Sequence, residues 1–173
     1  ISESFTVKGL KSGAARLAKE AWSAPDAEAC PTFERAIRTP GVSWVIVASP
    51  NVFHTPHILA AFDAIAQQEE QLADRLLSFL RSRNSVRIIG DPSGDRGRRV
   101  PTISFIAENH RSDEVVPRVD EHRIGIRYGD FYARRLIEKL GLTAQAGVTR
   151  VSMVHYKTVA EVDRLVEALD HIL

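Results

Sequence analysis

One arginine near the end of the chain combines a residue type and a setting that suit the binding of a small anion. In residues 150–156 (RVSMVHY) apolar and polar side chains alternate, which is typical of a strand. Val151 and Met153 share one face of this strand, and Arg150 and Ser152 share the other. A guanidinium donates two parallel hydrogen bonds to a carboxylate. Arg150 could therefore bind a carboxylate ligand, or it could pair with an acidic residue at the surface.

Histidines and loop arginines offer other chemistry. His54 and His57 could share a helix face as metal ligands, but no third ligand is evident. The arginine-rich residues 90–99 (GDPSGDRGRR) could hold a phosphate or form a solvated, flexible loop. Ser152 and His155 fall on opposite faces of the strand, which excludes a catalytic triad. We therefore expect neither a metal site nor a catalytic residue in this chain.

A well-marked helix follows the strand that carries Arg150. Thr158 and Glu161 have the spacing of a capping box, in which each side chain satisfies the backbone N–H of the other residue. Apolar residues then recur on one helical face, at positions 159, 162, 165, 166, 169 and 172. Upstream, the pattern predicts strands at 86–89, 100–106 and 124–128 and helices at 112–122 and 131–140. Paired strands with helices to one side predict an α+β sandwich.

The first part of the chain has a different pattern. Residues 42–48 (VSWVIVA) are nearly all apolar, which predicts a strand buried on both faces of a parallel sheet, followed by a loop at 49–51. We also expect a strand at 5–7, a helix at 14–22 and a helical turn at 33–38. A long helix is predicted from about Pro56 to Arg81, with its apolar stripe broken at Glu69. The fold class is thus α/β to α+β, in three parts: a partial Rossmann-like segment at 1–56, a connecting helix at 57–82 and an α+β domain at 83–173.

Composition excludes several classes of protein. A formal net charge of +1 gives no general attraction to nucleic acid or to anionic membranes. No apolar run is long enough to span a bilayer. A single cysteine, Cys30, excludes an internal disulfide framework and suits a reducing cytosol. We expect a cytoplasmic protein that binds neither nucleic acid nor membrane. The chain begins with Ile1 rather than methionine, as a processed or partial product would.

The second part of the chain resembles a known enzyme family. Residues 123–142 (RIGIRYGDFYARRLIEKLGL) and 147–173 (GVTRVSMVHYKTVAEVDRLVEALDHIL) are similar to the C-terminal small domain of class V aminotransferases, and closest to their cysteine-desulfurase-like branch. The resemblance extends back to about residue 60, through AAFDAIAQQEEQLADRLLSFLRS. It implies the small-domain fold of fold type I pyridoxal-phosphate (PLP) enzymes. It also matches Arg150 to the arginine that binds the α-carboxylate of an amino-acid substrate.

Two departures from the family pattern argue against catalysis by this chain alone. Desulfurases carry a nucleophilic cysteine in the loop that corresponds to residues 128–133, which here reads YGDFYA, with Tyr132 at or near that place. PLP also needs a lysine for its Schiff base, normally beside a histidine. The lysines, at positions 8, 11, 19, 139 and 157, have no such setting. The resemblance implies PLP, but the chain alone lacks a recognisable PLP lysine and the large domain, so we expect it to hold no cofactor by itself.

Residues 13–64 resemble a different family, the nucleotide domain of the glucose-fructose oxidoreductase and inositol dehydrogenase proteins. The similarity rests on VIVASPNVFHTPHILAA, which reads as a buried strand, a Pro-Asn loop, a histidine and a helix. It would place Pro50, Asn51 and His54 beside a nicotinamide, so that Asn51 and His54 become candidate cofactor-binding residues. The GxGxxG phosphate turn is absent, so no helix N-terminus would meet the pyrophosphate. NAD(P) is therefore a less favoured cofactor than PLP.

The two resemblances meet in the helix at residues 59–68, which suggests a chimera, either recombined or designed, or a partial chain. Three hypotheses for function follow. The first is a small-domain relative of class V aminotransferases that is catalytically incompetent alone and associates with a PLP-binding large domain or as a homodimer. The second is part of an active PLP transferase or lyase completed by another chain. The third is an NAD(P)-binding, oxidoreductase-like fragment.

Overall fold

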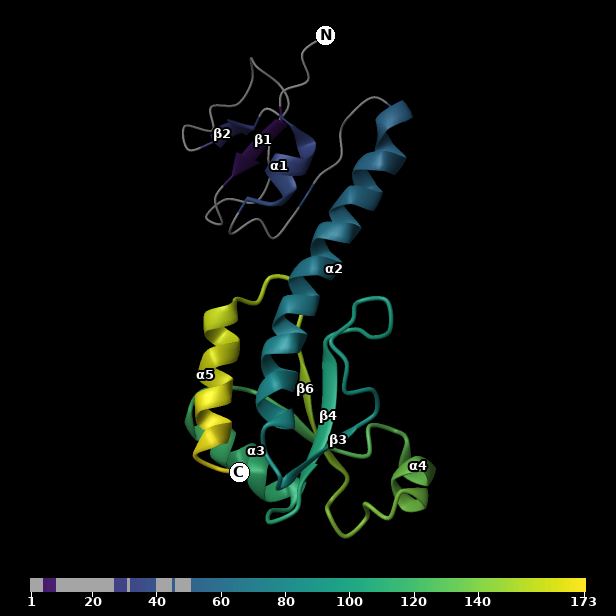
Figure 1. The fold of residues 1–173 in the computed structure, drawn as a ribbon, viewed down its shortest axis with the longest axis vertical. Coiled ribbons are helices and arrows are strands. Elements are labelled where there is room, and N and C mark those ends of the chain that lie inside the picture. The colour runs from purple at the N-terminus through teal and green to yellow at the C-terminus, as the bar shows by residue number, and fades with distance from the viewer. Residues whose placement is uncertain (1–4, 9–26, 31, 40–44, 46–50) are drawn as a thin grey trace. The chain divides into compact units, whose positions relative to one another are not determined.

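A computed structural model describes residues 5–8, 27–30, 32–39, 45 and 51–173 (Figure 1). The chain divides into an N-terminal unit, Ile1–Gln67, and a C-terminal unit, Gln68–Leu173. The long helix α2 (Asn51–Arg81) contributes residues to both units. The three-part division of the chain at residues 56 and 82 stays a prediction. None of the described helices has the length and apolar character that crossing a membrane requires.

The N-terminal unit contains a two-stranded antiparallel pair and a short helix. β1 (Phe5–Lys8) pairs with β2 (Ala27–Cys30), and α1 (Phe33–Ile37) follows. Thr32 caps α1, since its hydroxyl accepts a hydrogen bond from the backbone N–H of Arg35 at 3.2 Å. The strand expected at 5–7 and the helical turn expected at 33–38 are confirmed. The sequence does not reveal β2 (AEAC), because alanine and glutamate have little preference for strands.

Two further predictions for this unit fall mainly outside the described residues. The helix expected at 14–22 lies wholly outside them. Of the strand expected at 42–48, only Val45 is described; it belongs to no strand and its exposed fraction is 40%. The prediction of a buried strand is thus wrong at Val45. A short apolar run does not by itself distinguish a strand from other buried segments.

Helix α2 begins earlier than the sequence suggests. It begins at Asn51, whereas we expected a loop at this residue and a helix only from about Pro56. Pro56 lies inside the helix, near its N-terminal end. Its missing N–H removes one hydrogen bond, the one that would reach the carbonyl of Val52. This single loss near a helix end does not prevent helix formation.

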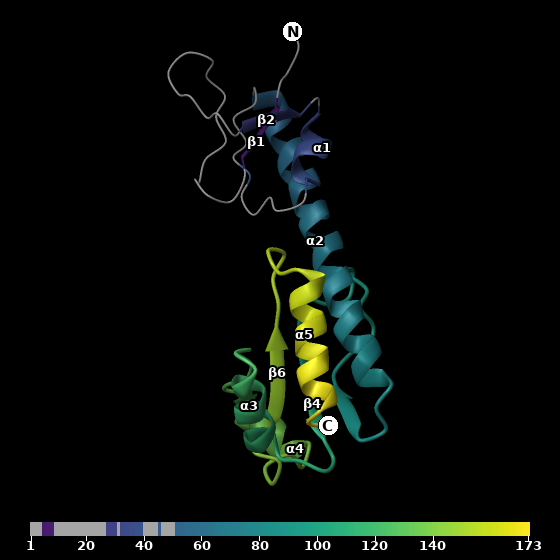
Figure 2. The same cartoon turned by 90° about the vertical axis from the view of Figure 1, so that its left-hand side faces the viewer.

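The C-terminal unit is built on a four-stranded antiparallel sheet with the strand order β3-β4-β6-β5. The strands are β3 (Val86–Ile89), β4 (Thr102–Ala107), β5 (Arg127–Gly129) and β6 (Val148–Ser152). The helices α3 (Ser112–Glu121), α4 (Arg134–Lys139) and α5 (Val159–Asp170) alternate with them along the chain (Figures 1 and 2). The expected succession of helices and strands, and the α+β character of this part, are confirmed.

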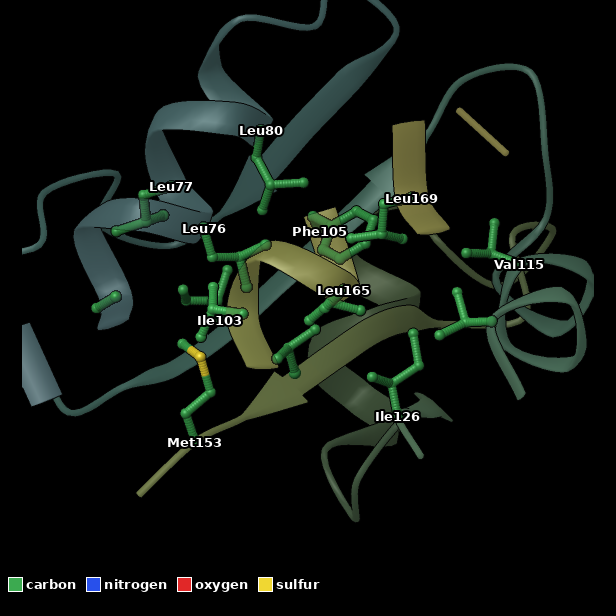
Figure 3. Packing of buried hydrophobic residues seen from close by; sticks show 14 of the residues in the cluster. Leu76, Leu77, Leu80, Ile103, Phe105, Val115, Ile126, Met153, Leu165 and Leu169 are labelled. Carbon is green, nitrogen blue, oxygen red and sulfur yellow. The ribbon is translucent and has the colours of Figure 1, made fainter. Parts of the chain in front are cut away.

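The main core of this unit lies on one face of the sheet, against α2, α3 and α5 (Figure 3). Leu76 of α2, Phe105 of β4 and Leu169 of α5 are completely buried in it. A second, smaller cluster contains Ile106 of β4, Val148 of β6, and Ile137 and Leu142 from α4 and the turn after it, with Phe131 packed against it. Because side chains alternate along a strand, Ile106 and Val148 lie on the face opposite the main core. The sheet thus has apolar contacts on both faces, with helices on both sides rather than on one.

Several element boundaries differ from expectation. α4 begins at Arg134 rather than at 131, because Phe131 and Tyr132 have φ angles of 49° and 66°, in the left-handed region. β5 begins at Arg127 instead of 124, and β6 ends at Ser152 instead of 156. α3 begins at Ser112, as expected, with Arg111 at its N-cap position. Ser112 is buried and donates its hydroxyl to the carbonyl of Gly147 at 3.2 Å.

Candidate functional site

Arg150 lies in the middle of β6, on the face of the sheet that faces away from the main core. Its neighbours in the strand, Thr149 and Val151, are buried, and Val151 belongs to the main core. Arg150 pairs with Ser104 on β4 and with Arg127 on β5. The alternation predicted from the sequence is therefore confirmed. Because β6 has a hydrogen-bonded neighbour on each side, the backbone that carries Arg150 is held firmly.

The Arg150 guanidinium packs against an aromatic ring and has no acidic partner within the described part of the chain. Its Cζ lies 3.7 Å from the centre of the Phe131 ring, which is a close cation–π contact. Its Nε is buried and has no hydrogen-bond partner. The alternative interpretation, a surface arginine paired with a nearby acid, therefore does not fit this geometry. The charge remains available for a ligand.

Phe131 and Tyr132 lie in a tight loop between β5 and α4. Both have positive φ angles, an uncommon conformation for aromatic residues. Asp130 stabilises the loop, because its Oδ1 accepts a hydrogen bond from the N–H of Tyr132 at 3.0 Å and its carbonyl accepts one from Ala133 at 2.8 Å. The loop turns Phe131 toward Arg150 and leaves the Tyr132 side chain fully exposed. Tyr132 thus stands in open solvent at the position where desulfurases were expected to carry cysteine.

Sequence reasoning missed two residues of this site, Phe131 and Arg127. Arg127 is the direct cross-strand neighbour of Arg150 and is exposed. Like charges directly opposite each other destabilise a sheet, so the pair is an electrostatic cost unless an anion lies nearby. The alternation in the strand expected at 124–128 already carried the signal for Arg127. No sequence signal indicates the contact of Phe131, because it depends on the left-handed loop.

Lys139 and Lys157 do not fit a Schiff-base role. Lys139 is exposed at the end of α4. Lys157 donates a hydrogen bond to the carboxylate of Glu161, four residues later, and the two side chains form an ion pair at 3.2 Å. Neither lysine is buried beside a histidine, and neither is a cross-strand neighbour of Arg150. These two lysines therefore do not suit PLP as a covalently held cofactor.

The candidate nicotinamide residues occupy a helix. Asn51 is the first residue of α2 and His54 lies in its first turn, not in the loop that the oxidoreductase resemblance requires. His57 is buried, and its ring stacks on Phe33 with a centroid distance of 4.2 Å. This contact gives His57 a packing role. Among the residues that the structure describes, no group of three potential ligands could hold a metal ion.

The arginine-rich loop at 90–99 is held by its own chain. Arg98 pairs with Asp91 at 2.5 Å, and the N–H of Arg96 donates to Glu70 at 3.3 Å. Arg99 donates to the carbonyls of Asp91 and Thr102, each at 2.6 Å, and partial burial lowers the pKa of its guanidinium. Most of residues 90–99 are exposed and lie outside any helix or strand, as expected for a solvated loop, and its flexibility stays a prediction. The engagement of these arginines with internal acceptors argues against a phosphate site.

The sequence matches the family described as "Aminotransferase class-V" over residues 46–165. This protein therefore belongs to the class V aminotransferase family. It is 42% identical over 113 residues to the "Aminotransferase-like protein FGM3" of Gibberella zeae, a match that covers 65% of this chain and 28% of FGM3. It is 33% identical over 141 residues to the "Cysteine desulfurase-like protein ustD" of Aspergillus flavus, with coverage of 80% and 32%.

Solved structures agree on the fold. The cysteine desulfurase CsdA of Escherichia coli matches with a TM-score of 0.53 and 23% identity, and the apo cysteine desulfurase of Thermococcus onnurineus with 0.56 and 21%. Each match covers 73% of this chain and 32% of the other. The chain thus spans about a third or less of the length of these relatives.

Nothing in these comparisons supports the oxidoreductase resemblance at residues 13–64. The class V match begins at residue 46, so it includes both Asn51 and His54. The match to ustD covers 80% of the chain and therefore reaches into its N-terminal third. One family accounts for the sequence on both sides of the helix at 59–68, where we expected two families to meet. The chimera hypothesis loses its basis in that helix.

Proposed function

We propose that this chain is the carboxylate-binding small domain of a class V aminotransferase-like protein. The observation that carries the proposal is the state of Arg150: a guanidinium on a central strand, aligned by an aromatic ring, without an acidic partner in the described chain. Membership of the family supports this role, because members of such a family act on amino acids and each of these carries an α-carboxylate. The chain's own contribution is to bind and orient that carboxylate.

The same proposal assigns the remaining chemistry to groups outside these 173 residues. Lys139 and Lys157 do not fit a Schiff base, so we expect no transfer or elimination reaction by this chain alone. PLP, which the family normally binds, would be held by a large domain, either in a longer polypeptide or in a separate chain. Such a domain, or a second copy of this chain, is the expected partner, and the cytosol is the expected compartment.

A thermal-shift experiment tests the role of Arg150. L-Alanine should raise the melting temperature of the wild-type chain but not that of Arg150→Ala, because the substitution removes the carboxylate's partner. Arg134→Ala is the matched control: Arg134 is an exposed arginine on α4 that pairs with Glu138 one turn away, at 2.9 Å. L-Alanine should stabilise this control as it does the wild type. Equal stabilisation of Arg150→Ala would contradict the proposal.

A second experiment tests catalytic incompetence. The chain is incubated with PLP, reduced with borohydride and analysed by intact mass. We expect no stoichiometric adduct, because neither Lys139 nor Lys157 has the buried setting that favours a specific Schiff base. One adduct per chain, mapped to a single lysine, would show that the chain holds the cofactor itself.

A further inference from the structure

The Arg150 side chain has a buried Nε and a guanidinium that lies over the ring of Phe131. We propose that Phe131 is a positioning residue that orients Arg150 to bind a carboxylate end-on, through its two terminal Nη groups. The proposal rests on the carboxylate-binding function above and adds its geometry. It concerns the loop between β5 and α4, which sequence patterns place in a helix.

The first step is the accessibility of the guanidinium nitrogens. A guanidinium can bind a carboxylate with two hydrogen bonds in two ways, along the side edge with Nε and one Nη, or along the end with both Nη groups. The Nε of Arg150 is buried and makes no hydrogen bond. The side edge is therefore closed to a ligand. The Nη groups are not among the buried, unpaired atoms, so the end of the fork remains open.

The second step is the position of the aromatic ring. Phe131 lies with its ring centre 3.7 Å from the Cζ of Arg150, so it occupies one face of the guanidinium. The ring also packs against the smaller apolar cluster, which includes Ile106 and Val148. The ring of Phe131 thus packs against apolar residues of the sheet and also covers one face of the Arg150 guanidinium. This arrangement removes rotational freedom from a long side chain before a ligand arrives.

The third step is the strain in the loop. Phe131 and Tyr132 both have left-handed backbones, a conformation that is strained for residues other than glycine. The hydrogen bonds of Asp130 hold the loop in this state. Tyr132 gains no packing from it, since its side chain is fully exposed. The contact that the strained loop does create is the one between Phe131 and Arg150.

The test is an NMR titration of the full chain with L-alanine, in which the Nε and Nη signals of labelled arginine are followed. Arg150→Lys identifies the signals of Arg150. Three variants are compared with the wild type: Phe131→Leu keeps an apolar side chain but removes the ring, Phe131→Tyr keeps the ring, and Tyr132→Leu changes the exposed neighbour. Thermal unfolding establishes that each variant is folded.

In the wild type, the Nη signals should move with L-alanine much more than the Nε signal. Phe131→Leu should weaken alanine binding about tenfold, because the long Arg150 side chain is then no longer held in one orientation before the ligand arrives. Phe131→Tyr and Tyr132→Leu should bind as the wild type does. Equal affinity in Phe131→Leu would overturn the positioning role while leaving the carboxylate function intact, and a dominant Nε shift would overturn the end-on geometry.

Failure of the proposed function has a separate signature. If L-alanine moved no Arg150 signal in any variant, both proposals would fall. The contact between Phe131 and Arg150 can also be measured without ligand. The ring should shift the Nε–H resonance of Arg150 upfield in the wild type and not in Phe131→Leu. Absence of this shift would overturn the contact on which the positioning role depends.

Discussion

Gly147, the residue before β6, lies directly against the backbone of Gly129 at the end of β5. A Cβ placed on Gly147 would overlap the carbonyl group of Gly129 and lie 3.0 Å from its Cα. Gly147 also has a φ of +83°, in the left-handed region that glycine adopts readily. The close approach joins the start of the strand that carries Arg150 to the start of the loop that carries Phe131. This backbone contact therefore helps to position both Arg150 and Phe131.

This contact predicts that Gly147→Ala is strongly destabilising. We expect a loss of about 3 kcal/mol or more, from backbone strain and overpacking together. Gly141→Ala is the matched control, because Gly141 has a φ of +71° but nothing within 4 Å of its Cβ position. It should lose only about 1 kcal/mol. Urea denaturation measures both values, and equal losses would argue against the Gly129 contact.

The capping box of α5 predicts a pH dependence of stability. The backbone N–H of Thr158 donates to the Glu161 carboxylate at 2.8 Å and lowers the pKa of Glu161, with a further contribution from Lys157. Because the folded-state pKa is lowered, this stabilisation is present above the ordinary glutamate value of about 4.3 and is lost as the pH falls through the lower folded value. Glu161→Gln keeps the hydrogen-bonding geometry but does not titrate.

The measurement is urea denaturation of both proteins between neutral pH and about pH 3, a range that spans the glutamate titration. The stability difference between wild type and Glu161→Gln should be greatest at neutral pH and should shrink as the carboxylate is protonated. A difference that is constant over this range would show that the charge of Glu161 does not contribute to stability.

The loop at 90–99 predicts unequal roles for two adjacent arginines. Arg99 donates to several backbone carbonyls, whereas Arg98 makes a surface ion pair with Asp91. Arg99→Ala should destabilise the fold by about 1–3 kcal/mol, because it leaves partly buried carbonyls without a donor. Arg98→Ala should cost less than about 1 kcal/mol, as is usual for an exposed pair. Chemical denaturation distinguishes the two, and the reverse order would contradict the anchoring role of Arg99.

The features of this protein that the sequence predicts arise from local pattern, whereas the features that it does not predict arise from contacts in the folded chain. The two-residue period of a strand predicts the face of the sheet on which Arg150 lies. The three-residue spacing of Thr158 and Glu161 predicts the N-terminal cap of α5. Both depend on local pattern alone. The apolar run at 42–48 shows the limit of such patterns, since Val45 is exposed and outside any strand.

Other features depend on contacts between distant residues. Arg96 meets Glu70, 26 residues earlier in the chain, only after the loop folds back on α2, so the sequence shows a charge-rich loop without this partner. Phe131 contacts Arg150 because Phe131 and Tyr132 both adopt the left-handed backbone conformation. Since neither residue is glycine, the sequence does not predict this conformation. The central part of the candidate site therefore becomes visible only in the structure.

The most direct test of the central claim is a calorimetric titration of the wild-type chain with L-alanine and with L-alaninamide. The two ligands share an amine and a methyl group, but only L-alanine carries a carboxylate. We expect L-alanine to bind to the wild type and not to Arg150→Gln, and L-alaninamide to bind to neither. Equal binding of the two ligands to the wild type, or unchanged binding of L-alanine to Arg150→Gln, would contradict the assignment of Arg150 as the carboxylate-binding residue.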